Sequence, residues 1–62
     1  MTGAALKKDR QKLGLTQAGL ARRIGVHEVT IAKWETNAVK IPKPIALLIE
    51  LLVEKEKTEN RG

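Results

Sequence analysis

Residues 13–37 read LGLTQAGLARRIGVHEVTIAKWETN, and this stretch decides the fold. Thr16 is a residue type that commonly caps the start of a helix, and apolar residues at helical spacing follow it. Gly25 then stands where a left-handed turn residue would end that helix. A second apolar series at helical spacing follows the glycine. The stretch therefore predicts two short helices, over residues 17–24 and 28–36, joined by a glycine-containing turn.

The apolar residues of these two helices are expected to pack against each other. Ala21 is small, as is needed where two helices cross closely, and His27 could cap the second helix. Trp34 is the only aromatic residue of the chain, and its position in the apolar series assigns it to the core rather than to stacking on bases. We expect the wedge that sets the crossing angle to consist of Leu20, Ile24, Val26, Ile31 and Trp34.

Two more helices are expected, one on each side of this pair. The first runs from residue 3 to residue 13, with Thr2 as its cap and Gly14 as its terminator. Residues 37–43 form a loop, because the two prolines disfavour helix in the residues before them. The last helix spans residues 44–57. No segment alternates with the period of a strand, so the predicted fold class is all-α and compact, with four helices, or five if a frayed C-terminal turn forms its own.

Composition limits the functions that are open to the chain. Its 62 residues are expected to form a single domain, and a domain of this size buries only about 60% of its extended surface. With no cysteine and one histidine, we expect neither an enzyme nor a metal or cofactor site. No stretch approaches the roughly 18 apolar residues of a membrane span, and the N-terminus lacks the apolar core of a signal peptide. A cytoplasmic protein is therefore expected.

The positive charge is concentrated in one part of the chain. The net charge is +5, and residues 1–43 carry nine basic against three acidic side chains, whereas residues 44–62 carry three basic against four acidic ones. The predicted helix pair thus lies in a segment of net charge +6. Such localisation is typical of proteins that bind nucleic acid through its phosphates, although a basic face kept for solubility would give the same pattern.

Residues 6–52 resemble the phage repressor and Cro type of helix-turn-helix regulator. The matching positions are Thr16, Gln17, Leu20, Ala21, Ile24, Gly25, Val26, Ile31, Trp34 and Glu35. The resemblance implies a repressor-like DNA-binding domain of a bacterial or phage transcriptional regulator, with the helix-turn-helix at 16–36 and its second helix in the major groove. The sequence departs from the family at Gly19, where an acid usually completes a capping box, and at Asn37, where glycine is common.

The outward face of the motif's second helix is expected to contact base edges. With the apolar series turned inward, the helical period places Val29 and Lys33 outward, and Glu28 at the edge of the first turn. Val29 could pack on a thymine methyl group, Lys33 could approach guanine, and Glu28 could accept a hydrogen bond from cytosine. Glu28 could equally be a solvated acid that complements the positive end of the helix.

A second set of side chains is expected to contact phosphates or to support the base contacts. Gln17 stands at the start of the motif's first helix, where a helix N-terminus can meet a phosphate. The candidates are Gln17, His27, Thr30, Asn37, Lys40 and Lys43.

The resemblance also implies an ion pair between the first helix and the end of the third. Arg10 lies on the inward line of the first helix, between Leu6 and Leu13, where an unpaired cation would be costly. Glu35 follows Trp34 on the side nearest the core. Arg10 and Glu35 are therefore expected to form a half-buried pair that fixes helix orientation more than it adds stability.

The last helix carries more apolar residues than one core is expected to absorb. The stripe expected to pack on the other helices consists of Ile45, Leu48, Ile49 and Leu52. Leu47 and Leu51 lie about 100° from that stripe and are expected to form a dimer interface, although neighbouring helices could also cover them. Since this type of regulator reads paired half-sites, we expect a homodimeric repressor on double-stranded DNA with a short inverted repeat. The alternative is an antitoxin-type or other protein-binding module whose last helix grips a toxin or another partner protein.

Overall fold

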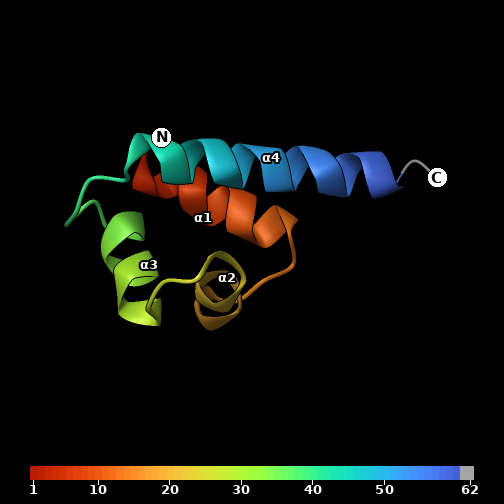
Figure 1. The fold of residues 1–62 in the computed structure, drawn as a ribbon. Coiled ribbons are helices and arrows are strands. Elements are labelled where there is room, and N and C mark those ends of the chain that lie inside the picture. Colours follow the sequence, from red (N-terminus) through yellow and green to blue (C-terminus); the bar gives the residue numbers. More distant parts are fainter. Residues whose placement is uncertain (61–62) are drawn as a thin grey trace.

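The computed structural model describes the backbone of residues 1–60 and the side chains of residues 1–56. It contains four helices, α1 (Gly3–Lys12), α2 (Gln17–Ile24), α3 (Glu28–Glu35) and α4 (Lys43–Asn60). α1 lies between α4 on one side and the α2–α3 pair on the other (Figure 1). No strand occurs within residues 1–60, so the all-α fold class is confirmed. None of the helices in this range is both long enough and apolar enough to cross a membrane.

The first three helices each begin at a residue whose side chain satisfies a free backbone N–H group. The side chains of Thr2, Thr16 and His27 accept hydrogen bonds of 3.0–3.1 Å from backbone N–H groups two or three residues later. The first four N–H groups of a helix have no partner within it, so each cap removes one unsatisfied donor. The starts of α1, α2 and α3 are therefore those that the sequence predicts.

Residues with positive φ follow these three helices. Gly14 and Gly25 have φ angles of 70° and 80°, and Asn37 has a φ of 63°. Glycine adopts this conformation without a Cβ clash, and asparagine tolerates it better than most residues. α1 and α3 end one residue earlier than expected, because Leu13 and Thr36 serve as C-caps.

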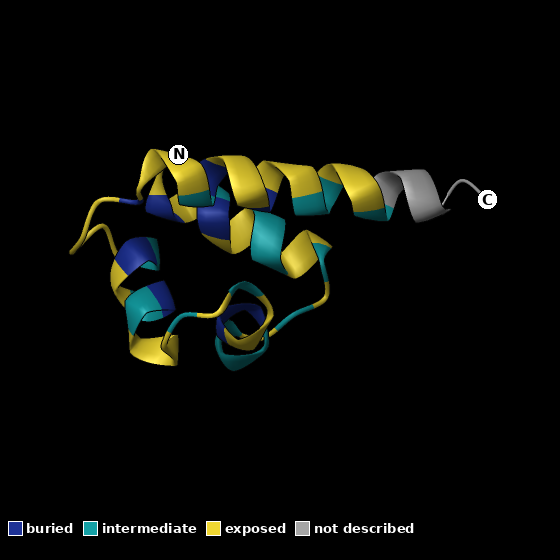
Figure 2. Ribbon diagram, in the orientation of Figure 1, coloured by how far each residue is buried: buried dark blue, intermediate teal, exposed yellow. Residues whose placement is uncertain are grey.

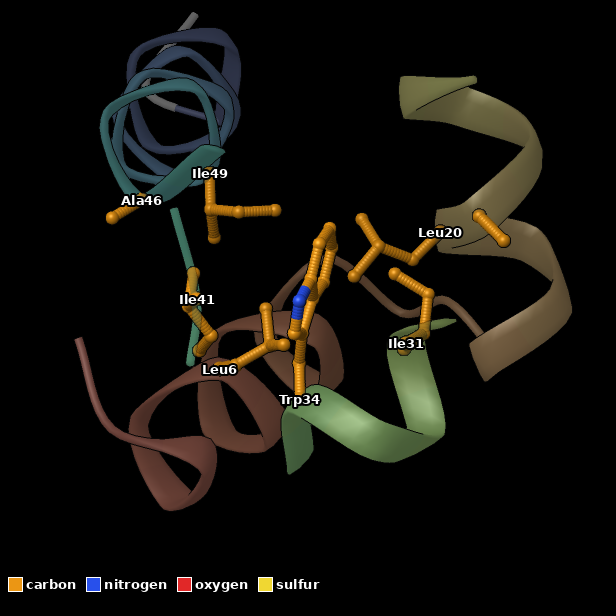
Figure 3. Close-up of a cluster of buried hydrophobic side chains, with 8 residues drawn as sticks. Leu6, Leu20, Ile31, Trp34, Ile41, Ala46 and Ile49 are labelled. Atoms are coloured by element: carbon orange, nitrogen blue, oxygen red, sulfur yellow. The ribbon is translucent and has the colours of Figure 1, made fainter. Parts of the chain in front are cut away.

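One cluster of buried side chains joins all four helices. Trp34 is 4% exposed and points from α3 into the cluster, between Leu20 of α2 and Ile49 of α4 (Figure 3). The aromatic ring is thus a packing element, as its spacing predicts. The buried members are Leu6, Leu20, Ala21, Ile31, Trp34, Ile41, Ala46 and Ile49, and Ile24 and Val26 pack against them.

One residue of the stripe expected on α4 turns away from the core, while Ile45 and Ile49 pack inward as expected. Ile49 is fully buried, whereas Leu48 is 37% exposed, so the expectation that Leu48 packs inward is wrong. Consecutive residues of a helix are about 100° apart, so a side centred on Ile49 turns Leu48 away. Ala46, three residues before Ile49, is buried instead. The helix also extends beyond the expected range 44–57 at both ends, from Lys43 to Asn60.

Candidate nucleic-acid interface

α3 lies at the edge of the domain, with one side against the core and the other toward solvent (Figure 2). Ile31 and Trp34 occupy the buried side. Val29 is 51% exposed, and Glu28 and Lys33 are exposed as well. Val29 and Lys33 are four residues apart and so share one face of the helix. The structure therefore presents the three expected base-contacting residues to solvent.

A tight turn fixes how α3 crosses α2. The carbonyl oxygen of Ala21 accepts hydrogen bonds of 2.9 Å from the N–H groups of both Gly25 and Val26. Ala21 is 3% exposed, so its small side chain lies where the two helices meet. Leu20 and Ile31 are fully buried at the same contact. The direction of α3 is thus set by the packing of its inner side and by the turn that precedes it.

His27 stands at the N-terminus of α3. Its Nδ1 accepts the 3.1 Å hydrogen bond from the Val29 N–H, which means that the neutral ring carries its proton on Nε2. The residue is exposed, so this Nε2–H is available to an acceptor outside the chain. The helix dipole adds partial positive charge at the same place, which favours an anion there.

Glu35 connects α3 to both other helices of the N-terminal part. Its Oε2 accepts a 2.6 Å hydrogen bond from Arg10 Nε, and its Oε1 accepts one of 3.1 Å from Gln17 Nε2. Arg10 also donates to the carbonyl oxygen of Leu15 at 3.0 Å. The side chains of Arg10 and Glu35 are only 13% and 5% exposed. The expected ion pair is therefore present, and it is part of a larger network.

The network sets the charge state of Glu35. Burial alone raises the pKa of its carboxyl group, but hydrogen bonds from Arg10 and Gln17 lower it, and the charges of Arg10 and Lys7 act in the same direction. The favourable interactions outweigh the burial, so the pKa of Glu35 lies below its ordinary value of 4.5. The carboxylate thus remains charged at neutral pH.

The structure gives Gln17 a different partner from the one expected. Its side-chain amide donates one of its two N–H groups to Glu35 within the chain, which leaves the second N–H for a phosphate. The backbone N–H groups in the first turn of α2 also point out of the N-terminal end of the helix. A phosphate is expected to bind at that end. A phosphate contact at Gln17 therefore stays a prediction, with the second side-chain N–H and the backbone N–H as its donors.

Asn37 and Gly3 form a contact that the sequence does not predict. The side-chain oxygen of Asn37 accepts a 3.0 Å hydrogen bond from the Gly3 N–H, so any phosphate contact of this residue has to come from its side-chain NH2 group. A Cβ on Gly3 would lie 2.6 Å from the carbonyl oxygen of Trp34, and it would also clash with the Glu35 carbonyl. Only glycine lets the start of α1 lie this close to the end of α3. No local sequence signal could have shown this, because the close approach arises only in the folded chain.

Exposed basic side chains follow and flank α3. Lys40 lies in the loop after α3 and Lys43 at the start of α4, and both are exposed. Arg22 and Arg23 are exposed on α2. Thr30 is half-buried within α3, which suits a supporting role better than a direct one. These positions agree with a positively charged surface beside α3, while their individual phosphate contacts remain predictions.

A comparison with known families gives one match. The family model described as helix-turn-helix matches residues 6–52, which is most of the chain. No curated protein and no solved structure matches significantly. The matched segment begins in α1 and ends in α4, so it contains the whole α2–α3 pair and both partners of the Arg10–Glu35 ion pair.

Proposed function

From the premise that this chain belongs to the helix-turn-helix family of DNA-binding transcriptional regulators, we propose that it is a repressor that binds a short inverted repeat as a homodimer. The observation that carries the proposal is the two-sided character of α3. Its inner side is fixed by the core, and its outer side presents Val29, Lys33 and Glu28. A rigid helix with an exposed outer side is what the major groove of B-DNA, about 12 Å wide, admits.

The outer side chains of α3 suit particular base edges. The branched apolar side chain of Val29 fits against a thymine methyl group, and the ammonium group of Lys33 is a donor for guanine O6 and N7. Glu28 is the one acid on this side; phosphates repel it, whereas the amino group of cytosine is a donor that its carboxylate accepts. We therefore propose these three residues as the source of sequence preference.

The surrounding groups would fix the register of the domain on the duplex. The Nε2–H of His27, the first turn of α2 beginning at Gln17, and the ammonium groups of Lys40 and Lys43 are donors that phosphate oxygens accept. Such contacts carry no sequence information, but they make binding depend strongly on salt.

Repression requires no further site on the chain. A domain that occupies its operator excludes other proteins from the same DNA, whereas activation needs an additional contact with the transcription machinery. We propose no catalytic activity, since His27, the single histidine, uses Nδ1 as a helix cap. The action of the protein then depends only on where and how tightly it binds.

Selection of bound duplexes from a random pool tests the proposal. We expect an inverted repeat whose half-sites lie about one helical turn apart, 10–10.5 base pairs. Affinity for the selected duplex should fall steeply as the salt concentration rises, with a linear relation between the logarithms of the two. Enrichment of no sequence, together with binding that salt does not weaken, would contradict the proposal.

A further inference from the structure

Three leucines of α4 form an exposed apolar surface, here called the leucine face. Leu47, Leu48 and Leu51 are 52%, 37% and 66% exposed. Figure 2 shows that the side of α4 turned away from α1 is exposed along its described length. Adjacent exposed apolar side chains on a small domain are typical of contact surfaces.

The described part of the chain cannot cover the leucine face. Ile49 is two residues after Leu47 and so about 200° around the helix, on the buried side. That side rests on the core, because Ile49 is fully buried and Ala46 is 9% exposed. The leucine face therefore points directly away from the other three helices.

Charge indicates what kind of molecule can approach this face. Residues 1–43 have a net charge of +6, whereas residues 44–62, which contain all of α4 except Lys43, have a net charge of −1. DNA and acidic partners gain little from an approach at α4. Two copies of this chain, each with a net charge of +5, repel each other least when they meet at α4, because that contact keeps their two segments of net charge +6 apart.

We propose that a second copy packs its own leucine face against the first, with the two α4 helices antiparallel about a two-fold axis. This inference rests on the proposed homodimer and specifies its interface. Self-complementary contact about a two-fold axis buries the same patch on both copies.

The charges along α4 favour the antiparallel direction. Lys43 begins the helix and Lys40 lies just before it, whereas the later part, residues 50–60, carries four glutamates against two lysines, a net charge of −2. An antiparallel pair places the basic start of each helix beside the acidic part of the other, and it also opposes the two helix dipoles. A parallel pair would align like charges and like dipoles.

The size of the face implies a dimer that dissociates on dilution. A standard interface buries roughly 800 Å² on each partner. A leucine is smaller than an aromatic side chain, which itself buries at most about 250 Å². Three leucines that are already partly covered therefore bury less than the area of a standard interface. DNA with two half-sites would then hold the two copies together, because the second copy binds a site that is already close by.

Sedimentation equilibrium over a wide concentration range tests whether a second copy of the chain covers the leucine face. The wild-type mass should rise with concentration from 6.8 kDa to twice that value, and Leu51→Glu should stay at 6.8 kDa throughout. Val39→Glu is the matched control, since Val39 is 46% exposed in the loop before α4 and the change adds the same charge. It should associate like the wild type. Circular dichroism verifies that the Leu51→Glu variant is folded. If this variant is unfolded, Leu47→Glu is used in its place.

Two results of that experiment would overturn the proposal. A wild-type protein that remains at 6.8 kDa up to millimolar concentration leaves the leucine face to another partner, as in an antitoxin-type module. A folded Leu51→Glu variant that associates as strongly as the wild type places the interface elsewhere.

Disulfide trapping tests the direction of the helices, because the chain contains no cysteine of its own. Pro44 and Lys55, the two positions to be changed to cysteine, lie beyond opposite ends of the leucine face. They are only about 20° apart around the helix, so both point toward the partner helix. An antiparallel pair should give a covalent dimer when the two variants are mixed and oxidised, and little with either variant alone. A covalent dimer from each variant alone, and none specific to the mixture, would show a parallel pair and overturn the proposal.

DNA binding separates this inference from the proposed function. Leu51→Glu should bind a single half-site like the wild type, but it should lose the gain in affinity from a second half-site, on the order of a hundredfold. If wild type and variant both fail to bind any half-site, the proposed function fails, while sedimentation and trapping still decide the dimer. If the variant keeps the full gain, the dimer interface proposed here is wrong.

Discussion

Arg10 in α1 and Glu35 at the end of α3 are joined by a 2.6 Å hydrogen bond between Nε and Oε2. A second bond, 3.3 Å long, joins Arg10 Nη2 to Glu35 Oε1. Both side chains are nearly buried, so neither charge can turn to water if the other is removed. Because the pair attaches the end of α3 to α1, it fixes the helix whose outer side we propose to contact DNA.

Glu35→Ala should be strongly destabilising. The change leaves the guanidinium group of Arg10 buried without its carboxylate and removes the acceptor of Gln17. Breaking a buried pair in this way costs roughly 3–5 kcal/mol of the free energy of unfolding. Urea denaturation followed by circular dichroism measures it. Glu28→Ala is the control, because it removes an exposed carboxylate from the same helix. It should change the free energy of unfolding by about 0.5 kcal/mol or less. Equal stability of Glu35→Ala and the wild type would show that the pair contributes nothing.

Acid should weaken the fold through the same carboxylate. Because the pKa of Glu35 is lower in the folded chain than its ordinary value of 4.5, its contribution is complete above that value. The contribution is lost as the pH falls from about 4.5 through the folded pKa. Glu35→Gln cannot ionise, so the stability difference between wild type and this variant should narrow in that range. Thermal melts at a series of pH values measure it, and a difference that is constant from neutral pH to pH 3 would contradict the account.

His27→Ala should loosen the start of α3. The variant loses the acceptor for the Val29 N–H, and loss of an N-cap costs about 1 kcal/mol. His27→Asn is the matched replacement, since an asparagine side chain also accepts this bond, and it should retain most of the stability. Chemical denaturation distinguishes the two. If alanine and asparagine at this position are equally stable, the cap has no role.

Gly3→Ala should destabilise the fold, although alanine favours helices. The added Cβ would meet the backbone carbonyls of Trp34 and Glu35, so α1 or α3 would have to shift. Forcing an extra methyl group into a packed contact costs about 1–3 kcal/mol. Ala4→Ser, at the exposed neighbouring position, should change stability by about 0.5 kcal/mol. Thermal melts compare the two, and a Gly3→Ala variant as stable as the wild type would show that the approach is not tight.

The local features of the fold were predictable because they follow from single residue types. Thr2 and Thr16 cap helices through their own hydroxyl groups, and Gly25 and Asn37 adopt the left-handed turn at the places where the periodicity stops. The exposed face of α3 then follows from helical periodicity once Trp34 is placed inward.

The remaining features depend on how the helices meet in space. Gly3 reads as an ordinary helix residue until α3 lies against it. Leu48 is exposed and Ala46 is buried because α4 is rotated so that Ile49 is central, and sequence periodicity alone allows either rotation. Gln17 bonds to Glu35 because α2 passes the end of α3, a relation that no spacing in the sequence reveals.

The most direct test of the account is to compare base preferences selected from random DNA by the wild type, Val29→Ala, Lys33→Ala and Lys40→Ala. We predict that Val29→Ala and Lys33→Ala each relax the preference at their own base position, with Lys33→Ala costing roughly 1–3 kcal/mol on the preferred sequence. Lys40→Ala should weaken binding to all sequences alike. It should also reduce the slope of log affinity against log salt concentration by about one. Unchanged base preferences in both Val29→Ala and Lys33→Ala would contradict the claim that the outer side of α3 reads DNA.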